Sequence, residues 1–148
     1  MITGTDIIYA LNDAIVSFAP EATVYLQFCP MDFERPSYFV WREKTSIQRV
    51  NTGLIFVDST YVVTSFCTID ERGESARGDI LSAMDDLSSV FYRGYISVGD
   101  RAIKYDTYTA TEDFDRATIE LRFSYYESDE QRSTGPLIED VIVDGELN

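Results

Sequence analysis

A chain of 148 residues has the size of a single domain, and such a domain buries roughly 70% of the surface that its unfolded form exposes. It therefore needs neither a metal nor a disulfide to hold a core together, and its ten Tyr and nine Phe argue against disorder. The formal net charge of −14, with only 12 Lys and Arg against 26 Asp and Glu, disfavours ordinary binding to nucleic-acid phosphates, which takes clustered bases.

The compartment is predicted from hydropathy and cysteine usage. No run approaches the ~20 apolar residues of a membrane span, and the N-terminus lacks the basic-then-apolar layout of a signal peptide. We therefore expect a soluble protein made in a cytoplasm. Cys29 and Cys67 each lie in an apolar run, which favours two buried free thiols over a disulfide.

The first elements follow from two periodicities. Residues 5–18 are predicted as an amphipathic helix, because Ile8, Leu11 and Ile15 fall on one face. Thr5 or Asp6 is the expected cap at its start. Residues 22–28 alternate apolar and polar side chains, which predicts a strand.

The stretch 33–41 is the one around which we expect the chain to be organised. Pro36 forces an extended backbone, and the residues after it are aromatic or β-branched. In a strand, Tyr38 and Val40 would point to one face and Phe39 and Trp41 to the other. Since both faces are apolar, the pattern predicts a central strand covered on both sides.

The rest of the chain reads as strands around one more helix. Long antiparallel strands are predicted over 46–69, with turns or bulges at 51–53 and 58–60 and a polar loop at 70–75. A helix is expected over 79–92, capped by Asp79 and stopped by Gly94. Strands near 95–98, 103–109 and 117–126, the first two joined by a turn at 99–100, then form a meander.

This order predicts one α+β domain over residues 1–128, an antiparallel or mixed β-sheet with two helices packed on one face. Residues 129–148 form an acidic C-terminal segment with an apolar run at 137–143. Two interpretations stay open for it: a disordered tail, or an arm that docks on a neighbouring subunit or adds a strand to an exposed edge.

Catalytic chemistry is hard to place on this sequence. Histidine is absent, and no phosphate-binding glycine loop, nucleophile elbow or C-x-x-C motif occurs. Asp85 and Asp86 are neighbours on a helix, so their side chains diverge, while Asp113 and Asp115 are expected in a solvated turn. The sequence thus predicts no catalytic, cofactor-binding or metal-binding residue, and not an enzyme. An enzyme would need a pocket of convergent carboxylates with displaced pKa values.

The stretch Phe33, Arg35, Pro36, Ser37, Tyr38, Phe39 and Val40, with the order of elements around it, resembles the tail terminator (tail completion) proteins of long-tailed phages and prophages. The element order covers most of the chain, and the motif covers eight residues. The sequence departs from that family in residues 58–61, where a shorter and more aromatic strand is usual, and in the acidic segment after Ser128.

The resemblance implies a structural protein of the virion at the tail–neck junction, made in the bacterial host cytoplasm. Subunits would form a ring, expected to be a hexamer, that caps the tail tube protein, stops its polymerisation and offers a surface to the head connector or neck protein. DNA would pass through the lumen without specific binding, and no membrane or cofactor would be involved. The residues expected at subunit or tail contacts are Glu34, Arg35, Pro36, Ser37, Tyr38, Glu71, Arg72, Glu74, Leu137, Ile138 and Val141.

Two other functions fit the same composition. An acidic inhibitor that mimics DNA would use carboxylates spaced like phosphates to occupy the basic groove of a nucleic-acid-binding protein. Another head–tail neck protein, such as a connector subunit, is the second. Competition with duplex DNA would identify the first, and gene neighbourhood would separate the second from a terminator.

Overall fold

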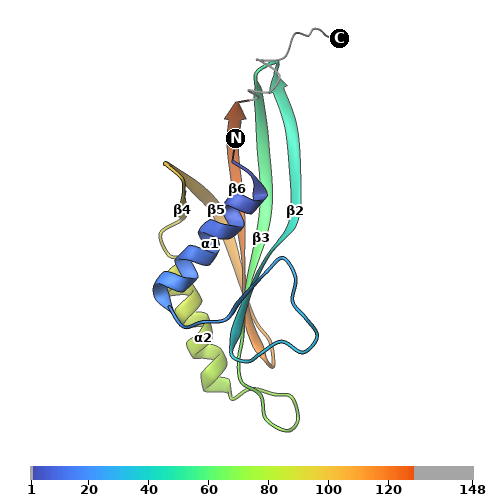
Figure 1. Cartoon of the computed structure of the whole chain (residues 1–148), viewed down its shortest axis with the longest axis vertical. Helices are drawn as coiled ribbons and strands as arrows, with labels where there is room; N and C mark the ends of the chain where they lie inside the picture. Colours follow the sequence, from blue (N-terminus) through green and yellow to red (C-terminus); the bar gives the residue numbers. More distant parts are fainter. Residues whose placement is uncertain (1, 129–148) are drawn as a thin grey trace.

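The computed structural model describes residues 2–128, apart from the side chains of residues 107 and 108. It is an α+β fold, as the sequence predicts, with one six-stranded mixed sheet in the order β1-β2-β3-β6-β5-β4 and two helices (Figure 1). In chain order the elements are α1 (Gly4–Phe18), β1 (Val24–Leu26), β2 (Ser37–Asn51), β3 (Leu54–Phe66), α2 (Arg77–Val90), β4 (Tyr95–Val98), β5 (Arg101–Glu112) and β6 (Arg116–Ser128).

A long hairpin of β2 and β3 forms one half of the sheet. The predicted turn at 51–53 is confirmed: β2 ends at Asn51, whose side-chain oxygen accepts from the Gly53 N–H at 2.9 Å. The turn or bulge predicted at 58–60 is wrong, because β3 runs through it unbroken. The irregularity lies instead in the partner strand, where the register shifts between Arg42 and Lys44.

The other half of the sheet is the meander that the sequence predicts. β4 pairs with β5, and β5 with β6, both antiparallel. β6 then joins the two halves, because it pairs antiparallel with β3 over its whole length, from Arg116 opposite Phe66 to Ser128 opposite Leu54. Only β1 is parallel to its neighbour, through three residue pairs with β2.

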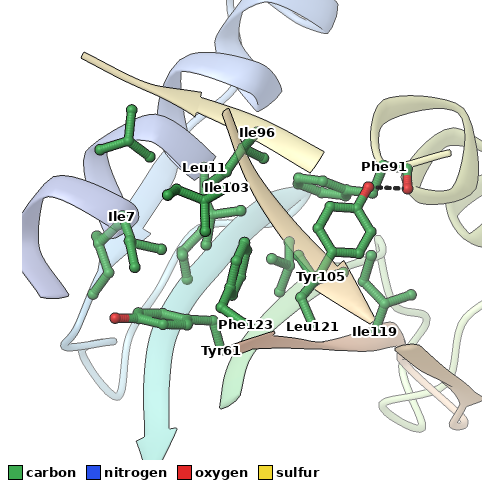
Figure 2. Packing of buried hydrophobic residues seen from close by; sticks show 14 of the residues in the cluster. Ile7, Leu11, Tyr61, Phe91, Ile96, Ile103, Tyr105, Ile119, Leu121 and Phe123 are labelled. Atoms are coloured by element: carbon green, nitrogen blue, oxygen red, sulfur yellow. Dashed lines mark hydrogen bonds between the residues drawn. The ribbon is translucent and has the colours of Figure 1, made fainter. Parts of the chain in front are cut away.

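Both helices pack on one face of this sheet. The side chains on that face alternate along β6, from Ala117 through Ile119 and Leu121 to Phe123, and all four are fully buried. Ile7, Ile8, Leu11 and Ile15 of α1 and Met84 and Leu87 of α2 belong to the same hydrophobic cluster. At its centre the ring of Phe123 meets those of Tyr61 and Tyr105 edge to face, at 5.5 and 5.6 Å (Figure 2).

The helix starts differ from the predicted ones. Thr3 caps α1: its side chain accepts from the Asp6 N–H at 3.1 Å, and the Asp6 carboxylate accepts from the Thr3 N–H at 2.9 Å. α2 begins at Arg77 after Ala76, whose side chain makes no cap bond, so Asp79 lies inside the first turn. There its negative charge still stabilises the helix, because it lies near the positive end of the helix dipole.

The organising stretch is placed less centrally than predicted. β2 begins only at Ser37, so residues 33–36 form a loop, and β2 is next to the edge strand β1. Val40 is fully buried under the helices, but Phe39 and Trp41, on the opposite face, are only half-buried. Their rings stack at 6.1 Å. The prediction of a strand covered on both sides is therefore wrong for the face that carries no helix.

The strand predicted over 22–28 is also shorter than expected. β1 holds only Val24–Leu26, and the backbone turns at Gln27, which has a φ of 67°. The Gln27 side chain reaches back and accepts the Arg42 N–H at 3.0 Å. The edge of β2 is thus occupied up to Arg42 and then left without a strand partner among the described residues.

Candidate functional site

The loop before β2 is fixed by Arg35. Its guanidinium donates to the carbonyl of Cys67 at 3.0 Å and to the carboxylate of Asp115 at 2.8 Å. Cys67 follows β3 and Asp115 precedes β6, so one side chain joins three segments that are far apart in the sequence. The Arg35–Pro36 peptide bond within this loop is cis.

Asp115 lies buried between two arginines. Arg116 donates to both of its carboxylate oxygens, at 2.8 and 3.0 Å, while Arg35 binds from the other side. The hydrogen bonds from Arg116, together with those from Arg35, lower the pKa of Asp115 against the opposing effect of burial. The solvated turn predicted for Asp115 is wrong, although Asp113 is exposed.

Aromatic rings complete this cluster. The ring centroids of Phe33 and Phe66 lie 4.2 Å apart. The guanidinium carbon of Arg35 is 4.7 Å from the Phe33 centroid and 5.4 Å from the Phe66 centroid. Arg116 lies 4.7 Å from the Phe66 ring. Both arginines thus combine a buried ion pair with cation–π contacts, which fixes the loop against the end of the sheet.

A cavity of about 630 Å³ opens beside this cluster. It lies between the segment after α1, the start of β2, the end of β3 and residues 79–86 of α2. Its wall includes carboxylates, aromatic rings and alanines. The carboxylates are those of Glu21, Glu34, Asp79 and Asp86, the rings are those of Tyr38 and Phe66, and the alanines are Ala19, Ala22 and Ala83. With four carboxylates and one guanidinium, that of Arg35, in its lining, the cavity suits a basic protein segment better than an anion.

Two residues of the organising stretch have unusual surroundings in this cavity wall. Ser37 is buried, and its hydroxyl has no hydrogen-bond partner among the described residues. Burial raises the pKa of Tyr38, and the negative charge of Asp86 raises it further.

The second group of predicted contact residues lies in the loop between β3 and α2. Asp70 organises this loop, because its side chain accepts from the N–H groups of Arg72 and Glu74 at 2.8 and 3.1 Å. Glu71, Arg72 and Glu74 are all exposed. Their side chains therefore face outward from a turn whose shape does not depend on them.

The structure brings both described groups to the same end of the molecule. Glu34, Arg35, Pro36, Ser37 and Tyr38 all line the cavity, and the 71–74 loop begins just after Cys67, to which Arg35 is bonded. In Figure 1 both loops lie at the end opposite the hairpin tip. The remaining predicted contacts, Leu137, Ile138 and Val141, lie outside the described residues.

Comparison with known proteins adds no relative. No protein-family model matches this chain, and no curated protein matches it significantly. Within residues 2–128, no group of three or more Cys, Asp or Glu side chains is arranged to hold a metal ion. None of the helices in that range is long and apolar enough to cross a membrane.

Sequence reasoning missed two buried carboxylates, at the two ends of β6. Glu127 is buried and forms an ion pair with Arg101, and it accepts the Ile2 N–H at 2.7 Å, which ties the chain start to β6. Asp115 is its counterpart at the other end. A signal was present: both positions fall on the same alternation as Ala117 to Tyr125, the inward-facing side chains of the strand.

On each side of the sheet, a short outermost strand leaves part of its neighbour uncovered. β1 pairs only with residues 38–40 of β2, and β4 pairs only with residues 101–104 of β5. The remaining part of each outer edge, 43–51 in β2 and 106–112 in β5, has no partner segment within residues 2–128. On the β2 edge, Ile47 is 63% exposed and Val50 is 51% exposed.

Proposed function

We propose that this protein is a ring-forming structural subunit that caps the end of a phage tail tube, as a tail terminator does. The observation that carries the proposal is the pair of uncovered edges on β2 and β5, at opposite sides of one sheet. The resemblance of residues 33–40 to tail terminator proteins gives the specific class.

Uncovered edges favour contacts between copies of the chain. An edge strand offers unpaired N–H and C=O groups, and proteins normally shorten, charge or cover it. Here the β2 edge stays open over nine residues, from Glu43 to Asn51, and carries exposed apolar side chains. Two different edges on opposite sides support a head-to-tail contact, and such contacts close into rings when the rotation allows it.

The end of the molecule that holds the cavity is the surface we propose for the tube or the neck. Glu34 and the 71–74 loop are exposed there, on a base fixed by the Arg35–Asp115 ion pair. A rigid base with outward-facing charged side chains suits a docking surface, because little conformational entropy is lost when it binds. Arg35 itself is used inside the subunit, so its role in this surface is to hold the loop.

The net charge fits passage of DNA through such a ring. With 26 acids against 12 bases per chain, a ring repels the phosphate backbone, so DNA slides without adhering. The same charge would also serve an acidic DNA mimic, which would occupy the basic groove of a nucleic-acid-binding protein.

The test is to image the purified full-length protein by negative-stain electron microscopy and to weigh it by native mass spectrometry over a range of concentrations. We expect annular particles with a central hole, and a mass that is a multiple of the subunit. Tail tube protein that polymerises in the presence of these rings should give shorter tubes. A monomer at every concentration, both alone and with tubes, would overturn the proposal, and displacement of duplex DNA from a DNA-binding protein would favour the mimic.

A further inference from the structure

We infer that the ring closes by antiparallel pairing of the uncovered edge of β2 in one copy with the uncovered edge of β5 in the next. This inference rests on the proposed function and names the contact that would build the ring. Its occupant is a second copy of this chain, argued from the shape, the direction and the charge of the two edges.

The two edges leave complementary gaps. β1 and Gln27 cover the first part of β2 and leave residues 43–51 open, while β4 covers the first part of β5 and leaves residues 106–112 open. β2 and β5 run in opposite directions in the sheet, since each strand from β2 through β3 and β6 to β5 is antiparallel to the next. Neighbouring copies in the same orientation therefore present β2 and β5 as an antiparallel pair.

In this contact, the paired side chains of the two copies lie on the same face of the joined sheet. Ser46 lies near the middle of the open β2 edge and pairs with Asp58, on the face without helices. Thr109 lies at the middle of the open β5 edge and pairs with Glu120, which is opposite Val62 on the same face. Placing Ser46 of one copy opposite Thr109 of the next thus joins the two sheets with the helices of both copies on the same face.

With Ser46 placed opposite Thr109, the stagger that results for each subunit is compatible with a closed ring. Within one subunit, Ser46 pairs with Asp58 of β3, and Asp58 pairs with Ser124 of β6. Thr109 of β5 pairs with Glu120 of β6, which is four residues before Ser124 along the same strand. Four residues are roughly 13 Å along a strand, and the four strands β2, β3, β6 and β5 span roughly 19 Å across the sheet. This ratio inclines the strands by roughly 35° to the ring axis, at the lower end of the tilt in closed β-barrels.

Charge selects this contact over a symmetric one. The open β2 edge carries Lys44 and Arg49 against one acid, Glu43, and the open β5 edge carries Asp106 and Glu112 and no base. Pairing β2 with a second β2, or β5 with a second β5, would bring like charges together, which is unfavourable. The contact between the two different edges brings opposite charges together.

The experiment is a cysteine cross-linking test between two full-length variants, both made with Cys29→Ser because Cys29 is partly accessible. One carries Ser46→Cys and the other Thr109→Cys, and the two are mixed and oxidised. We expect a disulfide-linked dimer in the mixture and less than a tenth as much in either variant alone. A third variant, Thr111→Cys, detects a register shifted by two residues, and Asp13→Cys on the exposed side of α1 is the control that should not cross-link.

The same samples are weighed by native mass spectrometry, which separates the two ways of failing. Rings without a cross-link from Ser46→Cys to either β5 position would overturn this contact and leave the proposed ring intact. A Ser46→Cys variant that links to itself would also overturn it, because that result requires a symmetric β2 contact. Monomers throughout would overturn the proposed function together with this inference.

Discussion

The two halves of β2 differ in almost every respect. From Ser37 to Trp41 the strand lies between β1 and β3, and every side chain is at least half-buried. From Arg42 to Asn51 all ten side chains are exposed, and only β3 pairs with the strand. One strand thus serves the subunit's own core at its start and, in our proposal, a neighbouring subunit at its end. The difference teaches that stability and assembly should be separable along this strand.

The largest loss of stability is expected from removing the Asp115 carboxylate, which holds the loop before the first half of β2. Asp115→Ala leaves Arg35 and Arg116 without their shared partner, and breaking a buried ion pair in this way costs about 3 kcal/mol of unfolding free energy. Urea denaturation followed by circular dichroism measures it. The matched control is Asp113→Ala, which is exposed and should change the free energy by less than about 0.5 kcal/mol. Equal effects of the two variants would show that the cluster does not stabilise the fold.

A matched pair of valines compares the two halves directly. Val40→Ala removes two buried methyl groups from the core and should lower the unfolding free energy by about 2 kcal/mol. Val50→Ala makes the same chemical change at a position that is 51% exposed, and should stay within about 0.5 kcal/mol. Thermal and urea unfolding of both variants, measured on the monomer at low concentration, decide the comparison. A Val50→Ala loss as large as that of Val40→Ala would mean that the second half is covered within the subunit.

Acid should lower the unfolding free energy through Asp115, which anchors the loop before the first half of β2, more than through the second half of the strand. The loss should be smaller than that caused by Asp115→Ala or Val40→Ala. The pKa of Asp115 is lowered in the folded state by hydrogen bonds from Arg116 and Arg35. Its contribution is therefore complete above the unfolded pKa of about 3.9 and is lost as the pH falls through the lower folded value. Unfolding free energies measured from pH 5 downward should fall less steeply in Asp115→Asn than in the unsubstituted protein.

Asp58 supplies the control for that titration. Its pKa is also lowered, first by hydrogen bonds from Arg122, but this ion pair lies on the helix-free face, where solvent screens it. Asp58→Asn should thus change the pH dependence less than Asp115→Asn does. The reverse order would contradict the assignment of Asp115 as the anchor of the loop.

Local patterns in the sequence determined much of the fold. The alternation from Ala117 to Tyr125 fixed the inward face of β6, and the stripe of Ile8, Leu11 and Ile15 fixed the buried side of α1. Asn51 to Gly53 marked the hairpin, because these residue types favour a tight turn. These features depend only on neighbours within a few positions, so the sequence alone specifies them.

Only the tertiary structure decided what each side chain meets. Periodicity places Asp115 on the inward side of β6, but Arg35, its partner, is 80 residues away in the sequence. The same limit explains the error at Phe39 and Trp41: their hydrophobicity predicts a covered face, yet both helices pack on the other one. A period of two tells which way a side chain points. Whether a helix, an arginine or water lies there depends on contacts between distant segments, which no local pattern records.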